Sequence, residues 1–139
     1  MVQVIICTHE QMAIGVKKTA EFIMGPQENL HAIAAYTKEQ VDYEHEIATF
    51  LQKHPTEPVV VLTDIVGGSV NTALAKMIPT HKNLQLIAGV NLPMVVQLLL
   101  SNEQDLEATI AKTIREAKNG IQDINQTIKT ETEIISDDF

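Results

Sequence analysis

An alternation of short apolar runs with longer amphipathic stretches is the feature that most constrains how this chain can fold. Runs with the length and composition of buried strands cover residues 2–7, 31–36, 59–62 and 84–88. Each run is followed by a stretch in which apolar residues recur at helical spacing. This order predicts an α/β fold, in which an open, mostly parallel sheet of four strands has helices on both faces.

Local signals predict where the helices begin and end. Residues 12–24 carry one apolar stripe and read as the first helix. Residues 37–40 (Thr-Lys-Glu-Gln) match a capping box, which predicts that the second helix opens there. Pro79 is expected to end the third helix, and Pro93 to lie in the first turn of the fourth. The second helix is expected to turn these residues toward the core: Val41, Ile47, Phe50 and Leu51.

The end of the chain carries weaker patterns. A further helix is expected to open near Asp105 and to close at Gly120, and residues 121–124 are apolar enough for a fifth strand. Residues 125–139 are polar and end in acidic residues, which suits either a strand or a frayed tail. We therefore expect one domain over residues 1–124, followed by a tail over residues 125–139.

Charge and composition exclude several classes of function. Eighteen acidic and ten basic residues give a net charge of −8, which disfavours binding to nucleic acid. Two tyrosines and three phenylalanines, without a tryptophan, offer no platform for base stacking. The single cysteine, Cys7, excludes an internal disulfide and fits a reducing compartment. No apolar run reaches the length of a membrane span, and the N-terminus lacks a basic signal region, so we expect a cytoplasmic protein.

Chemically distinctive residues follow three of the expected strands. They are residues 8–10 (Thr-His-Glu), 64–69 (Asp-Ile-Val-Gly-Gly-Ser) and 89–93 (Gly-Val-Asn-Leu-Pro). The carboxyl ends of parallel strands meet at one edge of a sheet, and ligands bind where the strand order reverses. If the first and third strands are neighbours at that point, His9 and Asp64 approach each other.

A histidine beside an aspartate has a defined chemistry. The Asp64 carboxylate would accept a hydrogen bond from one ring nitrogen of His9 and leave a lone pair on the other, which can act as base, metal ligand or nucleophile. Gly67, Gly68 and Ser69 lead into a helix, where backbone amides favour an anion. Together these residues suggest a phosphoryl group carried on His9. The ordinary alternative is a histidine that only forms hydrogen bonds at a strand end, beside a common Gly-Gly-Ser loop.

Other chemistries lack residues that they need. Asp42 and His45 have helical metal-ligand spacing, but no second pair accompanies them, so we expect neither a metal nor a cofactor. Ser69 does not lie in the G-x-S-x-G motif of a nucleophile elbow, and no lysine follows the glycines as in a Walker loop. Asp64 stands where a receiver domain has its phospho-acceptor, but the acidic pair that a receiver carries after its first strand is missing.

Three motifs, in order and at matching spacing, resemble one protein family over about residues 1–124. They are residues 4–9 (Val-Ile-Ile-Cys-Thr-His), 62–71 (Leu-Thr-Asp-Ile-Val-Gly-Gly-Ser-Val-Asn) and 87–94 (Ile-Ala-Gly-Val-Asn-Leu-Pro-Met). The family is the enzyme IIA component of the mannose family of the bacterial phosphoenolpyruvate-dependent sugar phosphotransferase system. A free-standing IIA protein of this family is one domain of this size.

The resemblance implies a site and a set of partners. The family's phosphorylated histidine corresponds to His9, and the aspartate that holds its ring corresponds to Asp64. His9 would receive phosphate from phospho-HPr and give it to a IIB component, which serves the membrane subunits IIC and IID. Family members are homodimers in which a C-terminal strand crosses to the partner, and residues 121–124 match that strand. The residues expected to bind the phosphoryl group are Thr8, Gly67, Gly68 and Ser69.

Two positions depart from the family's pattern. The family usually has glycine after the histidine, where this chain has Glu10, and often proline after Gly-Gly-Ser, where it has Val70. Neither change removes a group that the chemistry requires. An acid beside a phosphohistidine would repel the phosphoryl group unless its side chain points away.

Three other functions stay open at this point. They are a phosphocarrier subunit of a dihydroxyacetone kinase, a phosphorylatable domain that reports sugar flux to a transcription factor, and a flavodoxin-like module that binds a nucleotide. The motifs at residues 67–69 and 89–93 favour the sugar family over the kinase subunit. No DNA-binding or ATPase domain accompanies the sequence, and the few aromatic residues disfavour flavin stacking. The resemblance implies that the membrane components, rather than this protein, bind the sugar.

Overall fold

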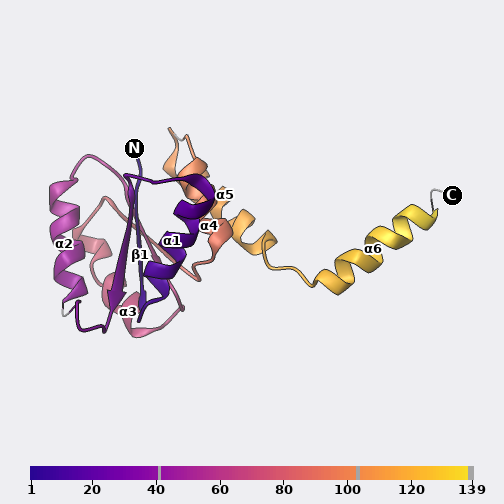
Figure 1. Ribbon diagram of the computed structural model, residues 1–139. Helices are drawn as coiled ribbons and strands as arrows, with labels where there is room; N and C mark the ends of the chain where they lie inside the picture. Colours follow the sequence, from indigo (N-terminus) through magenta and orange to yellow (C-terminus); the bar gives the residue numbers. More distant parts are fainter. Residues whose placement is uncertain (41, 103, 138–139) are drawn as a thin grey trace.

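The four expected strands form one parallel sheet (Figure 1). The computed structural model describes residues 1–40, 42–102 and 104–137, with side chains up to residue 132. The sheet order is β2-β1-β3-β4, and all three strand pairs are parallel. The chain therefore reverses its direction of travel across the sheet between β1 and β3. The strands are β1 (Gln3–His9), β2 (Leu30–Ala35), β3 (Val59–Thr63) and β4 (Leu84–Ala88).

Both faces of the sheet are covered, as the continuous apolar runs predict. On β1, Val4 and Ile6 pack into one core, whereas Ile5 and Cys7 pack into the other. Helices α1 (Met12–Met24), α4 (Leu92–Leu100) and α5 (Leu106–Asn119) contribute to the first core. Helices α2 (Tyr43–Lys53) and α3 (Ser69–Ala75) contribute to the second. Each fully buried Val, Leu or Ile side chain stabilises the fold by roughly 1.5–3 kcal/mol.

Several boundaries agree with the sequence signals. Helices α1 and α4 and strand β4 have the expected ends, and Pro93 lies in the first turn of α4. Asp105 caps α5 by accepting a hydrogen bond from the amide of Ala108 at 3.2 Å. These elements begin and end at strong local signals, so their positions follow from short stretches of sequence.

The capping box expected at residues 37–40 is wrong. Helix α2 begins after Asp42, whose side chain accepts a hydrogen bond from the amide of His45 at 3.0 Å. Thr37 instead donates through Oγ1 to the carbonyl of Ala34 at 2.7 Å and closes a turn after β2. Val41, expected to face the core, lies outside the described residues.

The third helix is shorter than expected. Helix α3 ends at Ala75, and Pro79 lies within a separate 3₁₀ turn, Ile78–Thr80, rather than ending a longer helix. The first backbone amides of such a turn have no hydrogen-bond partner within it. Proline, which has no amide hydrogen, therefore fits at the start of the turn.

The fifth strand expected at residues 121–124 is not formed in this single chain. Residues 121–123 are irregular, and Ile124 begins α6 (Ile124–Asp137), so the described part of the tail is helical rather than a strand. Asp123 supports the helix by accepting a hydrogen bond from the amide of Gln126 at 3.3 Å. In Figure 1 this helix, in yellow, stands away from the sheet and the other helices.

Candidate functional site

The carboxyl ends of β1 and β3 bring His9 and Asp64 together at the switch in strand order. Nδ1 of His9 lies 2.8 Å from Oδ2 of Asp64. The backbone amide of His9 donates to the same carboxylate oxygen at 2.9 Å. Two bonds to one oxygen hold both the ring and the end of β1 against the start of the loop after β3.

The Asp64 carboxylate stays ionised in this arrangement. Burial acts to raise its pKa, but hydrogen bonds from the amide and ring of His9 outweigh burial and lower the pKa below its ordinary value. An ionised carboxylate only accepts hydrogen bonds, so Nδ1 of a neutral His9 ring carries the proton. The lone pair then resides on Nε2. The His9 side chain is 38% exposed, against 9% for Asp64, so the histidine is the accessible partner.

The loop between β3 and α3 places Ser69 beside that lone pair. Ser69 is the first residue of α3, and its Oγ lies 3.2 Å from Nε2 of His9. Gly67 has a φ of +74°, a left-handed conformation that glycine adopts readily. A Cβ on Gly68 would lie 3.2 Å from the carbonyl oxygen of Ile65 and 3.5 Å from Cε1 of His9. The two glycines thus allow the loop to pass close to the imidazole ring.

Two of the expected phosphoryl-binding groups have other partners. The Thr8 side chain is fully buried, and its Oγ1 accepts a hydrogen bond from the amide of Ala13 at 2.8 Å. Successive side chains on a strand point to opposite faces, so the side chain of Thr8 faces the core beneath α1, on the opposite face of β1 from that of His9. The amide of Gly68 donates to the carbonyl of Ile65 at 3.2 Å within the loop. Gly68 therefore leaves space beside the ring of His9, but its amide is not a free donor for a phosphoryl group.

Tyr36 is a site residue that the sequence analysis missed. Its ring stacks on that of His9 with a centroid distance of 5.5 Å and an interplanar angle of 29°. Its hydroxyl donates to Oγ of Ser69 at 2.8 Å and lies 3.4 Å from the hydroxyl of Tyr43. Tyr36 directly follows β2, so the rule that pointed to the other strand ends would also have found it.

Two non-glycine residues at this edge have left-handed backbones. They are Glu10, with a φ of 56°, and Tyr36, with a φ of 65°. The amide of Glu10 donates to the carbonyl of Ala35 at 3.0 Å, so the two strand ends are joined where both residues occur. The backbone at position 10 therefore turns in a way that glycine would adopt without strain.

The third distinctive segment has a structural role. The amides of Gly89 and Val90 both donate to the carbonyl of Thr63, at 3.0 and 2.9 Å. Asn91 caps α4 through the amide of Met94 and donates from Nδ2 to the carbonyl of Ala117 in α5. These bonds fix the chain after β4 and do not involve His9.

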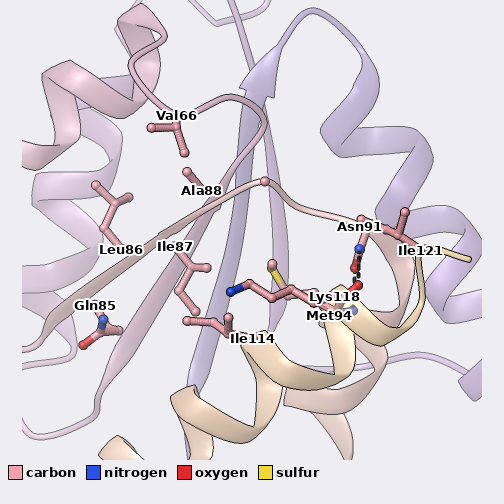
Figure 2. Close-up of a pocket in the computed structure, with 12 residues that line it drawn as sticks. Val66, Gln85, Leu86, Ile87, Ala88, Asn91, Met94, Ile114, Lys118 and Ile121 are labelled. Atoms are coloured by element: carbon pink, nitrogen blue, oxygen red, sulfur yellow. Dashed lines mark hydrogen bonds between the residues drawn. The ribbon is translucent and has the colours of Figure 1, made fainter.

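A separate groove of about 310 Å³ lies on the β4 side of the molecule (Figure 2). Side chains from β4, α4 and α5, among them Ile87, Met94 and Ile114, line it, and Ile121 lies at one end. The groove contains neither His9 nor Asp64. Over the described ranges, no three His, Cys, Asp or Glu side chains are grouped so that they could hold a metal ion.

The fold and the paired residues define a class of protein: a parallel α/β domain with a histidine held by an aspartate at the switch in strand order. Residues 3–117 match the family EIIA-man, described as the PTS system fructose IIA component. The chain therefore belongs to the EIIA-man family of phosphotransferase system IIA components.

Individual relatives agree with this family. The chain is 31% identical to the PTS system fructose-specific EIIA component of Bacillus subtilis, over 74% of this chain and 72% of that protein. It is 29% identical to the PTS system mannose-specific EIIAB component of Escherichia coli K12, over 87% of this chain. The match spans only 39% of the length of that EIIAB protein.

A solved structure shares the fold closely. It is a Klebsiella pneumoniae protein with a provisional description as a phosphoenolpyruvate-dependent sugar phosphotransferase system permease. The two chains superpose with a TM-score of 0.83 at 32% identity, over 91% of this chain and 93% of that one.

Among the helices described for this protein, none is long and apolar enough to cross a membrane.

Proposed function

We propose that this protein is a phosphocarrier of sugar uptake, which accepts a phosphoryl group from phospho-HPr on His9 and passes it to a IIB component. The observation that carries the proposal is the 2.8 Å contact between Nδ1 of His9 and the ionised Asp64, which leaves the lone pair on the accessible Nε2. Membership of the EIIA-man family supports the same chemistry.

In the proposed reaction, Nε2 of His9 attacks phosphorus. A nitrogen–phosphorus bond forms, the bond between phosphorus and the donor breaks, and its electron pair leaves with the donor. The proton on Nδ1 stays between the ring and Asp64, whose charge stabilises the positive charge that develops on the imidazole. Transfer to IIB reverses these steps with a new acceptor.

Ser69 is the group best placed to meet the phosphoryl oxygens. Its Oγ is 3.2 Å from Nε2, close to where phosphorus would bind, and Gly67 and Gly68 leave room beside the ring. The exposed surroundings of His9 suit a protein as donor and acceptor, since Ile65 and Val66 in the neighbouring loop are 61% and 78% exposed. A sugar-sized molecule is not required to enter this site.

The wider assignments belong to the same proposal. The carrier domain covers residues 1–124 and residues 125–139 follow it as a tail. The protein acts in the cytoplasm, serves the membrane subunits IIC and IID only through IIB, and forms a homodimer. For the homodimer we propose that residues 121–124 pair with the free edge of the partner's β4, beside the groove of Figure 2.

A phosphotransfer assay tests the site. Purified protein is mixed with phosphoenolpyruvate, enzyme I and HPr, and we expect an acid-labile, alkali-stable phosphate on the wild type and none on His9→Ala. Asp64→Asn should fold and accept phosphate roughly 10- to 100-fold more slowly, since it no longer provides a charged orienting partner.

His45→Ala is the matched control, because His45 lies on the exposed face of α2. It should be labelled like the wild type. Labelling of His9→Ala, or no label on the wild type beside an active HPr, would contradict the proposal. The regulatory or nucleotide-binding alternatives would then need to be tested.

A further inference from the structure

A series of hydrogen bonds connects the proposed accepting nitrogen of His9 to helix α2. From Nε2 it passes to Oγ of Ser69 at 3.2 Å, to the hydroxyl of Tyr36 at 2.8 Å and to the hydroxyl of Tyr43 at 3.4 Å. Its members come from β1, α3, the turn after β2, and α2. Asp64 holds Nδ1 on the other side of the ring, so the series and Asp64 contact different nitrogens of His9.

The ionised Asp64 determines the direction of each bond in the series. Because Nδ1 carries the ring proton, Nε2 can only accept, and the hydroxyl of Ser69 must donate to it. The oxygen of Ser69 then accepts from Tyr36. Tyr36 has one hydroxyl proton, which it donates to Ser69, so the hydroxyl of Tyr43 is the donor in the contact between the two tyrosines. All the hydroxyl protons thus point toward His9.

The backbone of Tyr36 indicates that its position is enforced. Its φ of 65° is uncommon for a bulky residue, and the residue is 55% exposed, so burial does not explain the conformation. Two hydrogen bonds hold the backbone next to Tyr36. Oγ1 of Thr37 donates to the carbonyl of Ala34, and the amide of Glu10 donates to the carbonyl of Ala35. Backbone strain that the surroundings hold in place is typical of functional sites.

We propose that Tyr36 is a positioning residue for phosphoryl transfer, acting on His9 through the hydroxyl of Ser69. This inference rests on the proposed function. In the unphosphorylated protein, the hydroxyl of Tyr36 donates to the oxygen of Ser69, so the serine proton is directed toward Nε2 of His9. The ring of Tyr36 also limits rotation of the imidazole. When the nitrogen–phosphorus bond forms, the Nε2 lone pair is consumed. The serine proton then turns to an oxygen of the phosphoryl group, which needs a donor at that position.

Tyr36→Phe tests the contact, since it keeps the stacked ring and removes only the hydroxyl. Tyr43→Phe is the matched control, because it removes the same atom one step further from His9. We expect Tyr36→Phe to slow phosphoryl uptake from phospho-HPr roughly three- to tenfold, as for the loss of one directed hydrogen bond, and Tyr43→Phe to stay within about twofold of the wild type. Equal rates in Tyr36→Phe and the wild type, or an equal fall in both variants, would overturn the proposal.

A second readout does not depend on phosphotransfer. The ¹⁵N resonance of Nε2 is measured in the unphosphorylated wild type, Tyr36→Phe and Ser69→Ala in mildly alkaline buffer, where Ser69→Ala gives the value without the serine bond. The Tyr36→Phe resonance should move from the wild-type position toward that value. An unchanged resonance overturns the role of Tyr36 even where transfer slows. If the wild type accepts no phosphate, the proposed function fails, and the resonance alone decides whether Tyr36 orients Ser69.

Discussion

The Asp64 carboxylate links the chemistry of the site to the stability of the molecule. Because its pKa is lowered by folding, the folded state holds the ionised form more strongly than the unfolded state does. Its contribution to stability is therefore fully present above the ordinary pKa of 3.8 and is lost as the pH falls through the lower pKa of the folded state.

Acid unfolding of an Asp64 variant measures this contribution. Between neutral pH and the region below about pH 4, the wild type should lose more unfolding free energy than Asp64→Asn, which has no carboxylate to protonate. Urea titrations at a series of pH values give the two curves. Parallel curves down to acid pH would show that Asp64 does not couple protonation to folding.

Glu10 has a backbone conformation that suits glycine better. A left-handed residue other than glycine is destabilised by about 1–2 kcal/mol, and the greater freedom of glycine in the unfolded chain offsets part of any gain. Glu10→Gly should therefore raise the unfolding free energy by up to about 1 kcal/mol. Glu10→Ala, which removes the same charge but keeps a Cβ, should give no such gain. A gain in Glu10→Ala as large as that in Glu10→Gly would assign the effect to charge instead.

At the scale of elements, prediction succeeded where a local signal determines the structure. Strands β1, β3 and β4 are short apolar runs buried on both faces, and α1, α4 and α5 have clear ends. The start of α2 was misplaced because Thr37 satisfies a capping pattern and yet uses its hydroxyl on the carbonyl of Ala34. A local motif cannot show which of two nearby caps the tertiary structure will use.

The candidate site was predictable to a similar extent. His9, Asp64 and Ser69 follow strands that pair or pack together, so the strand-end rule was enough to bring them to one place. Tyr36 was missed because the Ala-rich second strand was expected to cover residues 31–36, which placed Tyr36 inside the strand rather than after its end. Thr8 remains a prediction, and its hydroxyl accepts a hydrogen bond from the amide of Ala13, a contact that the strand-end rule alone does not give.

At the scale of the whole molecule, the free edge of β4 and the exposed residues after α5 lead to a prediction about assembly. Ile121 is 78% exposed in the single chain, next to the groove of Figure 2. The proposed homodimer would bury it, so light scattering should give about twice the chain mass of 15.4 kDa. Ile121→Asp should shift the protein toward monomer without unfolding it.

Ile23→Asp is the control for that experiment, since Ile23 is also exposed, at 58%, but lies on α1 away from the groove. It should leave the mass unchanged. A wild type that stays monomeric at all concentrations, or an equal shift in both variants, would contradict an interface at β4.

The groups around His9 are contributed by parts of the chain that lie far apart in sequence. His9 and Asp64 are 55 positions apart, His9 and Ser69 are 60 apart, and Tyr36 and Ser69 are 33 apart. Contacts of such long range form only when most of the sheet is in place. A chain that is still emerging from the ribosome, or that has lost β3, would present an untethered histidine. Under the proposed function, incompletely folded chains would therefore accept phosphate more slowly than folded ones.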